Sequence, residues 1–206
     1  MLKLLKKYLK RIYGYFVSPN YLISPNPDSS EFEVNNWAVS RFVLRKIAPI
    51  VGFHPYPLNE IMLMSSTVCR FRPSYIFEWG TNIGASARIF YETGKYFSVP
   101  LSIYSIDLPI DISHAEHPGE SRGDLVRGKK NVELHLGDGL TKSLEIYDGL
   151  PKAGRPLFFI DGDHSYDSVK RELIGVLSHV TSPLILLHDT FYQSPDSGYN
   201  LSLIHI

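Results

Sequence analysis

The sequence is short of the residues that mark secreted and membrane-spanning proteins. It has one cysteine in 206 residues, Cys69, so no intrachain disulfide can form and a reducing compartment is predicted. Its apolar runs are much shorter than a membrane span, and lysines interrupt the N-terminal apolar residues where a signal peptide would be continuous. These absences predict a cytoplasmic protein.

Acidic residues are absent from residues 1–27, which carry five bases: Lys3, Lys6, Lys7, Lys10 and Arg11. Because the net charge of the chain is zero, the remainder carries a charge of about −5. Residues 2–16 place apolar side chains at helical spacing, which predicts a basic amphipathic helix. Residues 1–17 would lie on the inner face of an anionic membrane, or would pack on the rest of the chain or on a partner subunit in a homo-oligomer. No nucleic-acid partner is expected.

The chain divides by composition into a basic helix with its linker (1–27), a pair of helices (28–73) and an α/β domain (74–200). The linker is rich in turn-forming residues. In the second part, Asp28 to Ser30 would cap a helix over 31–47 that Pro49 ends, and a further helix covers 58–71.

From Tyr75 onward, strand patterns alternate with helix patterns. The expected strands are 75–79, 101–106, 132–136, 156–160 and 183–187, and the expected helices are 85–96, 141–147 and 166–180. Strands that alternate with helices predict a mostly parallel sheet with helices on both faces. The fold class is therefore a doubly wound, Rossmann-like α/β domain.

A glycine-rich turn follows the first expected strand. Gly80 and Gly84 lie between that strand and the next helix, an arrangement that lets the backbone approach a nucleotide-like ligand. Acids follow the later strands: Asp107, Asp138, Asp161 with Asp163, and Asp189. The carboxyl ends of parallel strands share one edge, so these residues predict a ligand crevice.

The glycine that a dinucleotide-binding turn needs two positions before Gly80 is missing, because Glu78 stands there. A carboxylate at this position would repel a pyrophosphate, and it favours a ligand with a cation. S-adenosylmethionine (SAM) has an ammonium group, a sulfonium and no phosphate. Asp107 is placed to accept its ribose hydroxyls, and Asp138 is placed to meet the adenine edge.

Several motifs resemble those of class I SAM-dependent methyltransferases. They are Glu78-Trp-Gly-Thr81 with Gly84-Ala-Ser86, Tyr104-Ser-Ile-Asp107, Leu136-Gly-Asp138, Ile160-Asp-Gly-Asp-His-Ser-Tyr166 and Leu187-His-Asp189. Within that class the chain is most similar to a small O-methyltransferase-like group, over about residues 58–192. The resemblance implies a methyl transfer to a hydroxyl of a sugar, polysaccharide or secondary metabolite. It also implies a sheet of seven strands ordered 3-2-1-4-5-7-6, of which only five are present.

The resemblance also implies roles for individual residues. SAM contacts would come from Glu78, Gly80, Thr81, Gly84, Ser86, Asp107 and Asp138. In metal-dependent relatives the acid at Asp161 and acids after the fifth strand, here Asp189, hold Mg²⁺, and the acid at Asp163 acts as the base. His188 departs from that pattern, since imidazole is a poor Mg²⁺ ligand. Without a metal, His164 or His188 becomes the base.

Two other function classes remain open on the sequence alone. One is a nicotinamide-dependent oxidoreductase on a similar sheet, which the missing glycine disfavours. The other is a non-catalytic module with a methyltransferase fold, docked on a membrane through its N-terminal helix; acids at all five strand ends disfavour it.

The last six residues, 201–206, read Leu-Ser-Leu-Ile-His-Ile. The DNA sequence CTG-TCT-CTT-ATA-CAC-ATC encodes them and resembles a transposon mosaic end used as a sequencing adaptor. The expectation is adaptor read-through and a natural chain that continues beyond about Asn200, the alternative being a natural tail. A truncated sheet would expose the edge of its last strand and favour aggregation.

Overall fold

The structure is a computed structural model that describes residues 35–109, 111–112, 119–152 and 154–188. The expected helix over residues 1–17, the linker, the cap at 28–30, Asp189 and the tail 201–206 all lie outside these ranges. The chain forms two compact units, residues 1–70 and 71–206.

The first unit is helical in its described part. Helix α2 (Asn36–Phe42) continues through a π-helical turn (Val43–Ile47) into α3 (Ala48–Val51), and α4 (Leu58–Phe71) follows. The side chain of Asn35 caps α2 by accepting a hydrogen bond from the Ala38 N–H at 3.1 Å. No helix among the described residues is long and apolar enough to cross a membrane.

The predicted end of this first helix at Pro49 is wrong, because the helical path continues to Val51. Pro49 follows the π-helical turn directly, where the Ala48 N–H donates to the Val43 carbonyl, so the residue without a backbone N–H coincides with a change in the helical hydrogen-bond pattern. The chain leaves the helix at Gly52, whose φ is 73°. The described helix also starts at Asn36 rather than near residue 31.

The second unit contains a five-stranded parallel sheet with helices on both faces, as the sequence predicts. Its strands are β1 (Tyr75–Trp79), β2 (Ser102–Asp107), β3 (Val132–Leu136), β4 (Leu157–Ile160) and β5 (Leu184–Leu187). They lie in the order β3-β2-β1-β4-β5, and every neighbouring pair is parallel. This is the Rossmann-like arrangement, and its order agrees with the expected order for these five strands.

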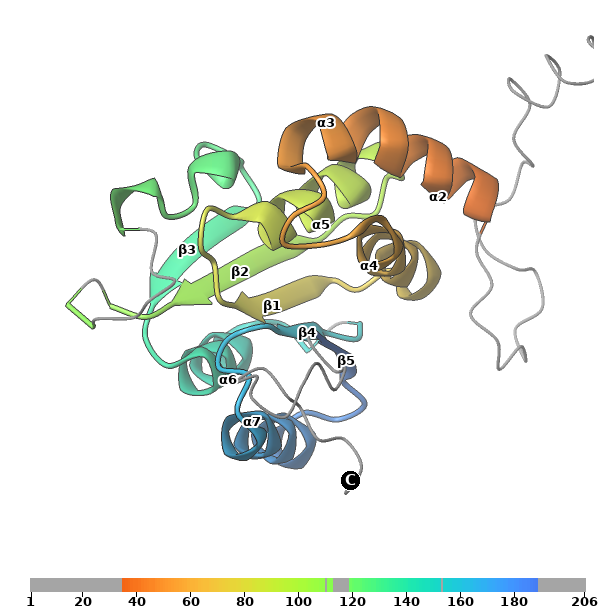
Figure 1. Cartoon of the computed structure of the whole chain (residues 1–206). Helices are drawn as coiled ribbons and strands as arrows, with labels where there is room; N and C mark the ends of the chain where they lie inside the picture. Colours follow the sequence, from red (N-terminus) through yellow and green to blue (C-terminus); the bar gives the residue numbers. More distant parts are fainter. Residues whose placement is uncertain (1–34, 110, 113–118, 153, 189–206) are drawn as a thin grey trace, which may run out of the picture. The chain divides into compact units, whose positions relative to one another are not determined.

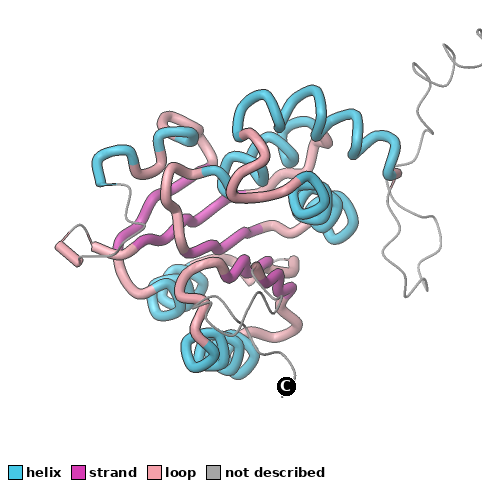
Figure 2. Tube along the Cα trace, in the orientation of Figure 1, coloured by secondary structure: helices cyan, strands magenta, loops and turns pink. Residues whose placement is uncertain are grey.

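Three helices cover the sheet (Figures 1 and 2). Helix α5 (Ala85–Tyr96) lies on one face, and α6 (Gly139–Gly149) and α7 (Tyr166–His179) lie on the other. Between β2 and β3 the described residues form only two short 3₁₀ turns, Gly119–Ser121 and Asp124–Val126.

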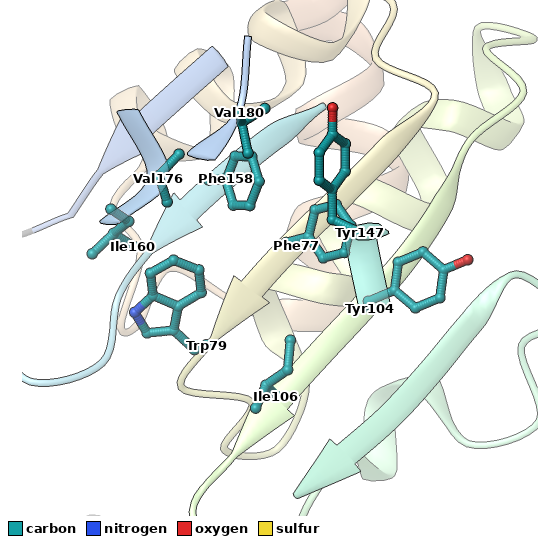
Figure 3. Close-up of a cluster of buried hydrophobic side chains, with 9 residues drawn as sticks. All are labelled: Phe77, Trp79, Tyr104, Ile106, Tyr147, Phe158, Ile160, Val176 and Val180. Carbon is teal, nitrogen blue, oxygen red and sulfur yellow. The ribbon is translucent and has the colours of Figure 1, made fainter. Parts of the chain in front are cut away.

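Aromatic side chains fill the space between the sheet and α6 and α7 (Figure 3). Phe77 stacks between Tyr104, with ring centroids 5.3 Å apart, and Phe158, at 5.0 Å. Val176 and Val180 pack against the same cluster from α7 and its C-terminal cap. This apolar layer fixes the positions of the strands, so the ends of β1, β2 and β4 are held on a rigid base.

Candidate functional site

The carboxyl ends of the five parallel strands meet at one edge of the sheet, and the chemically active side chains lie there. Gly80, Asp107, Asp138, Asp161 and His188 each follow or end a strand. In open parallel α/β sheets this edge is where ligands bind. The site is therefore built from loops on a rigid sheet.

The turn after β1 requires both of its glycines. Gly80 has a φ of 93°, and a Cβ at this position would lie 2.2 Å from the carbonyl oxygen of Asp161. Gly84 has a φ of 89° immediately before α5, and a Cβ there would lie 3.0 Å from Val126. The glycines thus allow the turn to pass close to the end of β4 and to the segment that precedes β3.

Glu78 lies beneath this turn, on the α5 face of the sheet, with only 1% of its surface exposed. Its Oε1 accepts a hydrogen bond from the Ser105 hydroxyl at 2.5 Å, and the Thr81 hydroxyl lies 2.6 Å from that of Ser105. Since Ser105 has one proton and gives it to Glu78, Thr81 donates to Ser105. The three side chains form an ordered polar chain inside the sheet.

Burial raises the pKa of Glu78 from 4.5 to about 7. Hydrogen bonds from Ser105 and the buried Ser86 oppose the shift, and the charges of Asp161 and Asp107 add to it. Its other oxygen, Oε2, is buried and makes no hydrogen bond of standard geometry to a described residue. A cation placed near Glu78 would therefore gain a strong electrostatic partner.

Asp107 ends β2 beside the glycine turn. Its Oδ2 accepts a hydrogen bond from the Asn82 N–H at 3.0 Å, and its Oδ1 accepts one from the Leu108 N–H at 2.8 Å. Each carboxylate oxygen can accept more than one hydrogen bond, so both keep capacity for ligand hydroxyls. The backbone contacts fix the orientation that such binding needs.

The segment between β2 and β3, for which the sequence predicts no helix or strand, lies against the same turn. The Gly123 N–H donates to the Asn82 carbonyl at 2.8 Å, and the Leu125 N–H donates to the Ile83 carbonyl at 3.0 Å. Arg88 of α5 donates to the Leu125 carbonyl at 2.7 Å. The segment before β3 therefore forms one wall of the glycine turn.

Asp138 has two structural partners. Its Oδ1 caps α6 by accepting from the Thr141 N–H at 2.9 Å, and its Oδ2 accepts from Arg171 of α7 at 2.7 Å. Partial burial opposes ionisation, but these bonds hold the pKa of Asp138 below its ordinary value. The contact of Asp138 with adenine remains a prediction. The same carboxylate already links α6 to α7.

Asp161 and His188 come together at the ends of β4 and β5. His188 Nδ1 lies 2.8 Å from Asp161 Oδ1, and each side chain is 11% exposed. The His164 ring lies nearby, with its centroid 6.3 Å from that of His188. The structure thus brings together three of the predicted catalytic and metal-binding residues.

Asp163 points to a different set of partners. Its carboxylate accepts hydrogen bonds from the Ser168 hydroxyl at 2.5 Å and from the Ser165 N–H at 2.9 Å. These bonds, led by that from Ser168, lower its pKa. A carboxylate stabilised in its ionised form is a weak proton acceptor, so the geometry favours a histidine over Asp163 as the base.

The described residues contain no group of three histidine, cysteine, aspartate or glutamate side chains that could hold a metal ion. Asp161 is engaged with His188, and Asp189 lies outside the described residues. The described part of the edge does not by itself fit a Mg²⁺ centre, and the Asp161–Asp189 site remains a prediction.

Sequence reasoning missed Ser105, Trp79, Arg171 and Glu172. Ser105 could have been found, because it stands two residues before Asp107 in β2 and lies on the same face of the sheet as its register partner Glu78 in β1. Trp79, Arg171 and Glu172 give no local signal, since their contacts join residues that are distant in the chain.

Comparisons with known proteins find no matching family model and no matching curated protein. Among solved structures, the chain is similar to one described as "a putative O-methyltransferase from Klebsiella pneumoniae". The two are 19% identical with a TM-score of 0.48, over 95% of this chain and 78% of the other. This similarity is too distant to assign a cofactor or a reaction to the chain.

Proposed function

We propose that this chain is a SAM-dependent methyltransferase that transfers a methyl group to a hydroxyl of a sugar, polysaccharide or secondary metabolite. The observation that carries the proposal is the buried carboxylate of Glu78 directly beneath a glycine turn, next to the carboxylate of Asp107. The motif resemblance described above points to the same class.

The negative charge of the carboxylates around the glycine turn favours some nucleotide-like ligands over others. Glu78, Asp107 and Asp161 are close enough for the last two to raise the pKa of the first. Three carboxylates disfavour the pyrophosphate of a nicotinamide cofactor and favour a ligand with an ammonium and a sulfonium group. The buried oxygen of Glu78 without a standard hydrogen bond fits such a cation.

Residues of the turn and of β2 would hold the cofactor. Glu78 and Ser86 would face its amino-acid part, Gly80, Thr81 and Gly84 would line the turn, and Asp107 would accept the ribose hydroxyls. SAM supplies a methyl group on a sulfonium, which is activated towards attack by an oxygen nucleophile.

The Asp161–His188 pair supplies the base in this proposal. His188 Nδ1 lies 2.8 Å from Asp161 Oδ1 without the geometry of a standard hydrogen bond, so the carboxylate acts on the ring through its charge. His188 would then accept the proton of the acceptor hydroxyl while the methyl carbon exchanges its bond to sulfur for a bond to that oxygen, and S-adenosylhomocysteine would leave as a neutral thioether. The charge of Asp161 would stabilise the imidazolium that results.

The test has a binding arm and a transfer arm. SAM and S-adenosylhomocysteine should raise the melting temperature of the full chain, whereas NADH should not. Protein with methyl-labelled SAM should then transfer label to members of a panel of sugars, polysaccharides and phenolic metabolites, with and without EDTA. Stabilisation by NADH and not by SAM would contradict the proposal. Loss of methyl transfer in EDTA would show that the reaction depends on a metal ion.

A further inference from the structure

Trp79 fills the space between two loops at the carboxyl edge of the sheet. It is the last residue of β1, and its side chain lies on the α6 and α7 face (Figure 3). A Cβ at Gly139 would lie 2.3 Å from Trp79 Cγ, and a Cβ at Gly162 would lie 2.8 Å from Trp79 Cδ1. The indole therefore occupies the volume that side chains would take at both positions.

These two glycines belong to the two loops that the proposed reaction uses. Gly139 follows Asp138 at the end of the loop after β3 and is the first residue of α6, on the cofactor side. Gly162 lies between Asp161 and Asp163 in the loop after β4, on the acceptor side. One side chain thus separates and supports both loops.

Glu172 of α7 lies beside the indole. It is 4% exposed, and burial raises its pKa to about 7, an effect that a hydrogen-bonding interaction with Trp79 opposes. Trp79 Nε1 and Glu172 Oε2 are buried, and neither makes a hydrogen bond of standard geometry to a described residue. The indole N–H and this carboxylate are therefore the partners available to each other.

The neighbouring residue of α7, Arg171, contacts one of the same loops. Arg171 Nη2 lies 2.7 Å from Asp138 Oδ2, and this hydrogen bond raises the pKa of Arg171, with smaller contributions from the charges of Asp138, Glu172 and Asp163. Helix α7 thus reaches the loop after β3 directly through Arg171, and it reaches both loops through Glu172 and the indole.

We propose that Trp79 is a positioning residue: seated on Gly139 and Gly162 and oriented by Glu172, it holds loop 137–139 in register with loop 161–164. This inference rests on the proposed function. Methyl transfer depends on the alignment of donor and acceptor, and a displacement of about 1 Å can cost a hundredfold in rate. A rigid ring between the loops would keep that alignment.

The chain has two tryptophans, Trp37 and Trp79, which allows a direct test. Trp37 is 76% exposed, so the variant Trp37→Phe leaves Trp79 as the single fluorophore at little structural cost. Titration of this variant with SAM is expected to change its emission, because binding orders the loop on which the indole rests. The complementary variant Trp79→Phe, which retains Trp37, should show no change.

Variants of the contact test its consequence. Gly139→Ala and Trp79→Leu are expected to weaken SAM binding about tenfold, measured by calorimetry, since both shift the cofactor-side loop. Val180→Ala is the matched control, because Val180 lies in the same cluster near the start of β4 (Figure 3). It should lower the melting temperature and leave SAM affinity unchanged.

A double-mutant cycle tests whether Glu172 acts through the indole. Glu172→Gln and Trp79→Phe should each weaken SAM binding. The SAM affinity of the double variant should equal that of the single variant with the larger loss. Additive losses would overturn the role assigned to Glu172.

The outcomes separate this inference from the proposed function. If calorimetry detects no SAM binding to the unmodified protein, the proposed function itself is contradicted. If SAM binds to the unmodified protein but the Trp79 emission does not change and Trp79→Leu keeps the same SAM affinity, the positioning role alone is overturned. If Trp79→Leu fails to fold, the emission of the Trp37→Phe protein still decides the matter.

Discussion

Replacing Glu78 with glutamine should change how the stability of the protein depends on pH. Glu78 is buried beneath the glycine turn, and its pKa is raised from 4.5 to about 7. The folded protein therefore binds this proton more tightly than the unfolded chain does. The associated stability is fully present below pH 4.5 and is lost as the pH rises through about 7.

The size of the loss follows from the two pKa values. Each pKa unit corresponds to about 1.4 kcal/mol, so the rise from 4.5 to about 7 makes ionised Glu78 cost about 3 kcal/mol, to order of magnitude. Glutamine keeps an acceptor for the Ser105 hydroxyl and has no charge to bury. Because part of this loss has already occurred at pH 5, the variant should gain about 2–3 kcal/mol relative to the unmodified protein between pH 5 and pH 8.5.

Urea unfolding at a series of pH values between 5 and 8.5 measures this difference. The acids with lowered pKa values, Asp138, Asp148 and Asp163, stay ionised throughout this range and drop out of the comparison. Glu145→Gln is the matched control, since the Glu145 side chain is 66% exposed and pairs with Lys142 rather than with a histidine, and it should show no pH-dependent gain. A difference between Glu78→Gln and the unmodified protein that stays constant across the range would refute the reasoning.

The remaining predictions concern the turn, the second buried acid and the base. Gly80→Ala should lower the free energy of unfolding by about 2–3 kcal/mol, because its Cβ would meet the Asp161 carbonyl, whereas Gly149→Ala, with open space around it, should be neutral or stabilising in the same urea assay. Glu172→Gln should gain stability relative to the unmodified protein as the pH rises from 5 to 8.5, as Glu78→Gln does, because burial also raises the pKa of Glu172 to about 7. His188→Gln should reduce labelled-methyl transfer by about a hundredfold or more and leave SAM affinity unchanged. If SAM binding falls by the same factor as transfer, His188 does not act as the base.

Much of the second unit was predictable because its signals are local. An apolar strand followed by a polar turn and an amphipathic helix repeats along residues 75–187, and five parallel strands follow from that alternation. The sheet order rests on the motif resemblance instead. The same approach failed at Pro49, because the helical path passes through a π-helical turn just before this proline, and no local pattern in the sequence indicates that turn.

The candidate site was predictable as a set of strand ends but not as a network. The acid after each strand is visible in the sequence, whereas its partner depends on which distant element packs beside it. Asp138 pairs with Arg171, thirty-three residues away, and Asp163 is held by serines at the start of α7. The sequence therefore located Asp163 correctly at the edge and could not show that its carboxylate is stabilised in its ionised form.

The most direct test of the central claim is a calorimetric titration of the protein with SAM, repeated on Asp107→Ala and on Asp148→Ala. Asp148 lies in α6 and pairs with His179, so its variant changes the net charge by the same amount without touching the glycine turn. The account predicts micromolar binding, weakened at least about tenfold in Asp107→Ala by the loss of charged hydrogen bonds to the ribose, and retained in Asp148→Ala. Binding that is equal in all three proteins, or absent from the folded unmodified protein, would contradict it.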